Sequence, residues 1–163
     1  MYRRPACNDA RPLRRAVLLI ALVLAGCGGD DEPTGDIGAG EFLQRITAEH
    51  LRGDFSESWE ELHPAHQKLI SQIQFVYCGE REPPLEEDAT VRILSVKPVT
   101  KELPRIPQHR AQAVRVQLRD KKGVVDTYTA HAVRVGDAWK WVLAGPFVQA
   151  VESGKCPDGS PLP

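Results

Sequence analysis

Three side chains in the C-terminal half of the sequence could support acid–base chemistry. Asp126 and Tyr128 stand two residues apart in a segment rich in β-branched residues, so a strand would place both on one face. A carboxylate and a phenol on one face could act as an acid–base pair. His131 lies further along the same strand, and its ordinary pKa near neutrality makes it a third candidate. The alternative for His131 is a structural histidine in the core or on the sheet surface.

His63 and His66 form an HxxH pair that could bind a metal ion if both stood on one helix. Pro64 lies between them, however, and a proline interrupts a helix. We therefore expect the two imidazoles to diverge at a solvated helix junction. Neither a metal site nor any other cofactor is expected.

The tryptophans are the remaining candidates for ligand contact. Trp59, Trp139 and Trp141 could line a pocket for a small molecule. Tryptophans also fill cores, and we expect two of the three to do so. The sequence contains no serine-nucleophile motif, P-loop, zinc-ligand spacing or RNA-binding signature.

The charge of the chain is divided between two segments. The whole chain of 163 residues has a net charge of −1, from 21 Lys+Arg and 22 Asp+Glu. Residues 1–26 hold five arginines and one acid, whereas residues 27–163 hold 16 bases and 21 acids. A length of this order allows one domain with a sizeable core. The low net charge argues against nucleic acid held by bulk charge, so no nucleic-acid partner is expected.

The N-terminal segment has the pattern of an export signal. An arginine-rich stretch precedes the ten apolar residues of 16–25, AVLLIALVLA, which are too few to span a bilayer. The next feature, Leu24-Ala25-Gly26-Cys27, resembles the lipobox of bacterial lipoprotein signal peptides at all four positions. This resemblance implies diacylglyceryl transfer to the Cys27 thiol and cleavage before Cys27. The protein would then be exported and lipid-anchored on the extracytoplasmic face of a cell membrane.

The resemblance also determines which cysteines remain for the folded domain. Cys7 would leave with the signal peptide and Cys27 would carry the lipid, which leaves Cys78 and Cys156. In an exported domain this even pair predicts a disulfide. The alternative is a two-cysteine metal or redox site. Residues 28–40, GGDDEPTGDIGAG, hold five glycines and four acids and are predicted to be a flexible tether.

Three short helices are predicted to follow the tether. Residues 41–52 show apolar residues at helical spacing, and Gly53 is a natural C-terminal stop. Asp54 and Glu57 form a capping-box pattern for a second helix, whose apolar stripe is Phe55, Trp59 and Leu62. A third helix is expected from Pro64 to Cys78-Gly79. Its predicted apolar face consists of Leu69, Ile70, Ile73, Val76 and Tyr77.

Strands are predicted for the rest of the chain. Residues 89–99 have a broken alternation that indicates a bulge or an edge strand, and residues 101–109 are predicted to be a loop because of Pro104 and Pro107. Residues 114–119 alternate as a half-buried strand, residues 125–135 form a long strand, and Gly136-Asp137 is a hairpin turn to residues 138–143. A short final helix is possible in residues 146–152.

Helices followed by an antiparallel meander define an α+β domain of three N-terminal helices on a curved sheet of about four strands. This order resembles the NTF2-like (cystatin-like, cone-shaped) domain, as do the segments WEELHP at 59–64 and VRVGDAWKW at 133–141. Many small actinobacterial lipoproteins look similar. The expected layout is a signal peptide at 1–26, the lipidated cysteine and tether at 27–40, the domain at 41–156 and a tail at 157–163.

The resemblance implies a pocket inside the cone and leaves three functions open. We expect a non-catalytic domain that binds a small molecule or an envelope protein at the membrane surface. The alternatives are a small cone-fold enzyme of isomerase or hydrolase type and a structural module that forms a homodimer. A dimer would need an exposed apolar sheet face, either the one carrying Val114, Val116 and Leu118 or the opposite one.

Overall fold

The structure is a computed structural model that describes residues 36–82 and 89–163. Cys7, the lipobox at residues 24–27 and most of the expected tether lie outside the described residues. The described residues form one compact unit. No helix in the described part of the chain is long and apolar enough to cross a membrane.

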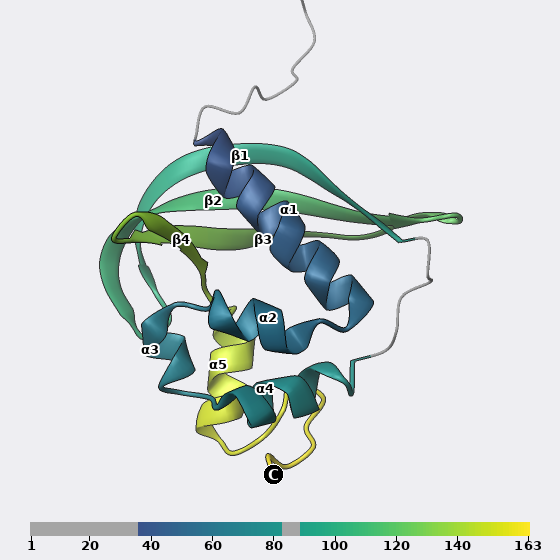
Figure 1. Cartoon of the computed structure of the whole chain (residues 1–163), viewed down its shortest axis with the longest axis vertical. Helices are drawn as coiled ribbons and strands as arrows, with labels where there is room; N and C mark the ends of the chain where they lie inside the picture. The colour runs from purple at the N-terminus through teal and green to yellow at the C-terminus, as the bar shows by residue number, and fades with distance from the viewer. Residues whose placement is uncertain (1–35, 83–88) are drawn as a thin grey trace, which may run out of the picture. The chain divides into compact units, whose positions relative to one another are not determined.

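Helices precede an antiparallel sheet, which confirms the α+β class (Figure 1). In the described ranges the helices are α1 (Ile37–Arg52), α2 (Phe55–Glu60), α3 (Pro64–Gln67), α4 (Gln72–Gly79) and α5 (Gly145–Glu152). The strands are β1 (Thr90–Leu103), β2 (Ile106–Asp120), β3 (Gly123–Val135) and β4 (Ala138–Trp141). They pair in the order β1-β2-β3-β4, with every neighbouring pair antiparallel.

Helix α1 begins four residues earlier than the sequence predicts. The Asp36 carboxylate accepts a hydrogen bond from the Gly38 N–H and caps the helix, which ends at Gly53 with φ 79° as expected. The last four residues of the predicted tether are therefore helical. The absence of a side chain at Gly40 explains the difference, because a Cβ there would lie only 2.9 Å from a Val96 methyl carbon. Gly40 thus allows α1 to pack closely on β1. The stability gained from this packing outweighs the poor helix propensity of glycine.

The region predicted as the third helix is two helices, so α1–α4 replace the three expected. Helix α3 begins at Pro64 as predicted and ends at Gln67. Ser71 then begins α4 with a capping box that includes Gln74. This restart rotates the apolar face, so Phe75 is buried whereas Ile73 is 78% exposed. The capping box predicted at Asp54 is also absent.

The loop predicted at residues 101–109 is a strand hairpin. Strand β1 continues to Leu103, β2 starts at Ile106, and Arg105 takes a positive φ of 57° in the tight turn between them. Pro107 is tolerated in β2 because pairing with β3 begins only at Ala111. Position 107 therefore needs no backbone N–H for a hydrogen bond to β3. The expected irregularity in the first strand is present as a register shift between Ile93 and Ser95.

The core lies between the sheet and α1. Val114 and Val116 are fully buried and Leu118 is 8% exposed, in one cluster with Leu43 and Ile46 of α1. The face that carries these β2 side chains is therefore covered by α1 and is not available to a second copy of the chain. The prediction that this face could form a homodimer is wrong. A smaller cluster occupies the end of the β1–β2 hairpin and contains Leu103, Ile106, Ala111, Val133 and Val142.

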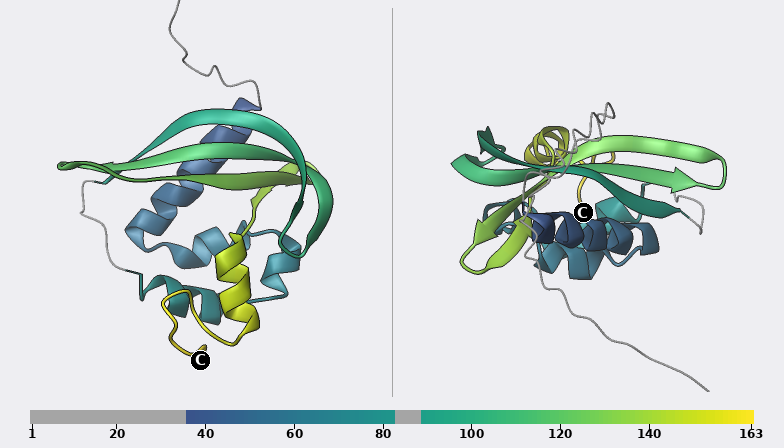
Figure 2. Two further views of the ribbon diagram at one scale, coloured as in Figure 1. Left: turned by 180° about the vertical axis from the view of Figure 1, so that it is seen from behind. Right: turned by 90° about the horizontal axis from the view of Figure 1, so that it is seen from above.

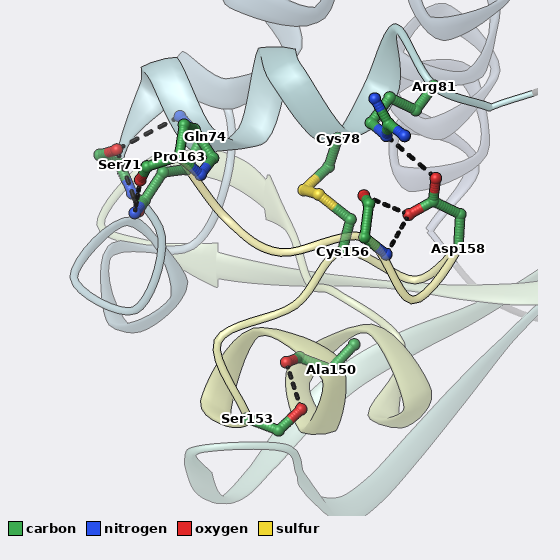
Figure 3. The surroundings of a disulfide bond; sticks show 10 residues. Ser71, Gln74, Cys78, Arg81, Ala150, Ser153, Cys156, Asp158 and Pro163 are labelled. Carbon is green, nitrogen blue, oxygen red and sulfur yellow. Dashed lines mark hydrogen bonds and ion pairs between the residues drawn. A yellow bond between two sulfur atoms is a disulfide. The ribbon is translucent and has the colours of Figure 1, made fainter.

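The predicted disulfide between Cys78 and Cys156 is present, with Cα atoms 5.3 Å apart (Figure 3). It joins α4 to the segment after α5. Residues 157–163, which the sequence sets apart as a tail, pack back onto the domain. Asp158 accepts a hydrogen bond from Arg81 at 3.0 Å, and the Pro163 carbonyl accepts one from Gln74 at 3.3 Å. The tail is therefore part of the fold.

Candidate functional site

A cavity of about 490 Å³, called here the main cavity, opens beside α1. Four segments form its walls: α1, the end of the β1–β2 hairpin, β3, and the chain from the end of β4 into α5. It is lined by Leu43, Ile46, Thr47, His50, residues 101–104, residues 128–131 and residues 141–145. Its walls are mostly apolar, with a few polar side chains among them. This combination is typical of a small-molecule site.

A second cavity of about 680 Å³ lies near the end of α1 and is more polar. Its ionisable lining consists of Glu80, Glu82 and Asp126, together with Arg52, His50 and Tyr128. Thr47, His50 and Tyr128 line both cavities. These three side chains are called the shared wall.

Hydrogen bonding fixes the proton of Tyr128 in the shared wall. The Thr47 hydroxyl donates to the Leu43 carbonyl at 2.8 Å. Because its only proton is used there, Thr47 Oγ1 must accept from the Tyr128 hydroxyl, 3.2 Å away. Burial raises the pKa of Tyr128 above its ordinary value, and the nearby carboxylates of Asp126 and Glu82 add to this rise against the opposing Thr47 bond. Tyr128 is therefore a neutral phenol.

The protonation state of His50 follows from a similar chain of bonds. The Ser58 hydroxyl donates to the Phe55 carbonyl at 3.0 Å, so it must accept from His50 Nε2–H at 2.9 Å. Burial lowers the pKa of His50 to about 4, which makes the ring neutral near pH 7. Nδ1 then carries a lone pair. The ring packs edge-on to Trp141, with centroids 5.1 Å apart. His50 therefore brings one hydrogen-bond acceptor to an aromatic wall.

The structure does not bring all four pocket residues that the sequence proposes to one cavity. Asp126 and Tyr128 share a strand face as predicted and both line the second cavity, but only Tyr128 also reaches the main cavity. His131 lines the main cavity, where burial lowers its pKa and the charge of Lys101 adds to the effect. Trp59 lines neither of these cavities, and its indole N–H donates to the Ile70 carbonyl at 3.0 Å. Tyr128 and His131 are thus the two that reach the main cavity.

The HxxH pair serves the fold. His66 is completely buried, so the expectation of a solvated junction is wrong for this residue. Its Nδ1 accepts from the Leu143 N–H at 3.0 Å, which leaves Nε2–H to donate to the Pro104 carbonyl at 2.7 Å. His63 Nδ1 accepts from the Ala65 N–H and caps α3. With both His66 nitrogens in use, the pair has no lone pair from His66 to offer a metal ion.

Within residues 36–82 and 89–163, no group of three or more His, Cys, Asp or Glu side chains could hold a metal ion. His50 was not selected by the sequence reasoning. It lies four residues after Ile46 and seven after Leu43, so a helical wheel places it on the buried stripe of α1. That spacing was the available signal.

Comparison of the chain with protein-family models, with curated proteins and with solved structures finds no match. The structure by itself establishes that the described residues form an α+β domain with one disulfide and a mostly apolar main cavity.

The depressed pKa of His50 predicts a loss of stability in acid. The unfolded chain binds a proton near pH 6.5, whereas the folded chain binds it only near pH 4. The contribution of neutral His50 to the free energy of unfolding is therefore complete above pH 6.5, and it is lost as the pH falls to about 4. A shift of this size corresponds to about 3 kcal/mol of unfolding free energy. Urea unfolding at pH 7 and at pH 4 measures the loss.

His50→Gln removes this titration and retains an N–H donor for Ser58. The fall in unfolding free energy between the two pH values should shrink by about 3 kcal/mol in this variant. His109→Gln, at an exposed position of β2, is the matched control and should leave the fall unchanged. An identical pH dependence in wild type and His50→Gln would contradict a buried neutral His50.

Proposed function

We propose that this protein is an exported lipoprotein, anchored through Cys27, whose NTF2-like domain binds a small neutral and largely apolar molecule without chemical change. The main cavity of about 490 Å³ is the observation that carries the binding proposal. Its size lies in the range of small-molecule sites. The curved sheet with α1 across its face supports the comparison with a cone (Figure 1).

The electrostatics of the main cavity favour a neutral ligand. His50 and Tyr128 are both neutral, and the two oppositely charged side chains in the lining, Lys101 and Glu102, are exposed. A charged group carried into the apolar part would therefore lose hydration without gaining a counter-charge. His50 Nδ1 offers an acceptor. The best fit is an apolar body with one hydrogen-bond donor, such as an alcohol, a phenol or an aryl amine.

The arrangement gives less support to the enzyme alternative. Catalysis by the pair proposed from the sequence would require Asp126 and Tyr128 to converge on one substrate. Both residues line the second cavity, but Asp126 is exposed and accepts from the Thr127 N–H at 2.7 Å, while the Tyr128 proton is engaged by Thr47. Binding without chemical change therefore remains the preferred proposal.

Filling the main cavity tests the binding proposal. Ala130 lies on β3, lines the cavity and is half-buried against the core. In Ala130→Phe the larger ring should occupy the ligand volume. The neutral fluorophore N-phenyl-1-naphthylamine is the probe, because it has an apolar body and one N–H donor. We expect saturable binding to wild type and an affinity at least about tenfold lower for Ala130→Phe, corresponding to 1.4 kcal/mol or more.

Ala138→Phe, at an exposed position on β4, is the matched control and should bind the probe as wild type does. Thermal unfolding of each variant verifies that it is folded at the temperature of the titration. Equal affinity in folded Ala130→Phe and wild type would contradict binding in the main cavity, as would the lack of saturable binding to wild type.

The anchor rests on the sequence of residues 1–27, where an arginine-rich start and an apolar run lead to Leu24-Ala25-Gly26-Cys27. Stable attachment would come from the acyl chains, since each buried methylene contributes about 0.8 kcal/mol. Cys27→Ala should therefore move the protein from the membrane pellet to the soluble fraction of lysed bacteria that express the full chain. Metabolic labelling with a radioactive fatty acid should label wild type only.

Cys7→Ala is the control for the anchor, because Cys7 would be removed with the signal peptide. This variant should be labelled and should sediment with membranes as wild type does. Fatty-acid labelling of the Cys27→Ala protein would show that the lipid is attached elsewhere and would overturn the assignment.

A further inference from the structure

A cluster of arginines lies on the sheet face that points away from α1. Register places Arg92 of β1 directly opposite Gln117 of β2, and Arg115 and Arg119 flank Gln117 on the same strand face. All three arginines are exposed. This surface, formed by Arg92, Arg115 and Arg119 around Gln117, is called the basic face. In Figure 2 (left), α1 lies behind β1–β3, and no described helix stands in front of these strands where β2 meets β3.

The basic face lacks compensating carboxylates among the described residues. The acids of β1–β3 are Glu102, Asp120 and Asp126. Glu102 lines the main cavity, Asp120 accepts from backbone N–H groups of the β2–β3 turn, and Asp126 is on the opposite face. Neighbouring like charges on a sheet are destabilising, so a bound anion would relieve a repulsion that the folded chain otherwise retains.

The distribution of charge along the chain reinforces this local asymmetry. Residues 90–135 hold ten bases and three acids, a net charge of +7. The rest of residues 27–163 holds six bases and eighteen acids, a net charge of −12. Four of these acids, at positions 30, 31, 32 and 36, adjoin the proposed anchor, and the remaining residues outside 90–135 still hold fourteen acids against six bases. This separation of charge favours an orientation with the sheet towards a negative surface.

We propose that the basic face binds the anionic phospholipid headgroups of the membrane that carries the Cys27 anchor. Guanidinium groups are suited to this partner because their planar N–H donors can bind a phosphate in pairs. The proposal rests on the anchor proposed above for its geometry. Nine residues, 28–36, separate Cys27 from α1, and they reach at most about 30 Å. The anchor would thus hold the domain within reach of the headgroups while the arginines set which face meets them.

Vesicle binding without the lipid anchor tests the basic face. The test protein is residues 27–163 with Cys27→Ser, which contains every described residue together with the core and the disulfide. It is mixed with vesicles of pure phosphatidylcholine or of equal parts phosphatidylcholine and phosphatidylglycerol, at 50 and 300 mM NaCl. We expect binding to the anionic vesicles at low salt, and weak binding to neutral vesicles or at high salt.

The triple variant Arg92→Gln, Arg115→Gln, Arg119→Gln should lower the partition coefficient on anionic vesicles by roughly tenfold to 100-fold, because each basic residue at an anionic leaflet contributes about fivefold. The matched control replaces Arg52, Lys68 and Lys155 by Gln. These exposed cations lie outside the sheet, so the control changes net charge equally and should bind vesicles with no more than a small loss.

Equal losses in the two triple variants would overturn the proposal, because bulk charge and not the basic face would then govern binding. Retained binding in the arginine variant, or equal binding to neutral vesicles, would also overturn it. If wild type does not bind the vesicles but binds soluble polyphosphate, and the arginine variant does not bind polyphosphate, the arginines serve a different anion and the membrane proposal is excluded. The test contains no acylated cysteine, so its failure is distinguishable from failure of the Cys27 anchor.

Discussion

A single buried imidazole joins the segments that frame the main cavity. His66 accepts from the Leu143 N–H and donates to the Pro104 carbonyl, and thereby connects α3 to the β1–β2 turn and to the chain after β4. Both partner residues line the cavity. A buried backbone group without a partner costs about 1–3 kcal/mol, so these bonds are strongly constrained. The ring must be neutral to make them both, and burial lowers its pKa in the required direction.

Backbone bonds extend this arrangement around the cavity. The Trp141 N–H donates to the Glu61 carbonyl and the His63 N–H donates to the Trp141 carbonyl, so the link between α2 and α3 pairs with the end of β4. The Trp141 indole N–H donates to the Ser58 carbonyl at 2.7 Å. His50 and Trp141 are consequently held against each other by contacts outside the cavity. A preorganised lining of this kind limits the entropy lost on binding a ligand.

Local rules predicted the parts of the fold that local interactions determine. Gly53 ends α1, Pro64 begins α3 and the first strand has a register shift, as local chain chemistry predicts. The Cys78–Cys156 disulfide was predicted from the two cysteines that the lipoprotein resemblance would leave for the domain. The early start of α1 was not predictable in this way. In the sequence, Gly40 belongs to a glycine-rich stretch typical of a tether, and its close contact with Val96 is formed only in the tertiary fold. The inclusion of Pro107 in β2 was likewise not predictable, because it depends on where β3 stops pairing with β2.

The site was harder to predict than the fold, because its residues come from distant segments. Tyr128 and His131 were found from strand periodicity alone, and both reach the main cavity. His50 and His66 were missed as contributors since their partners, Ser58 for one and Pro104 and Leu143 for the other, are defined only by the tertiary fold. The positive charge of residues 90–135 is present in the sequence, but the grouping of Arg92, Arg115 and Arg119 on one open face requires the register of β1 and β2.

The most direct measurement of ligand position is a set of intermolecular nuclear Overhauser effects between bound N-phenyl-1-naphthylamine and the methyl groups of residues 27–163. Binding in the main cavity predicts contacts to Leu43, Ile46 and Leu143. Contacts confined to the exposed apolar side chains Ile73, Val124 and Val125 would contradict the account, because the probe would then sit on the surface and the main cavity would not be its site.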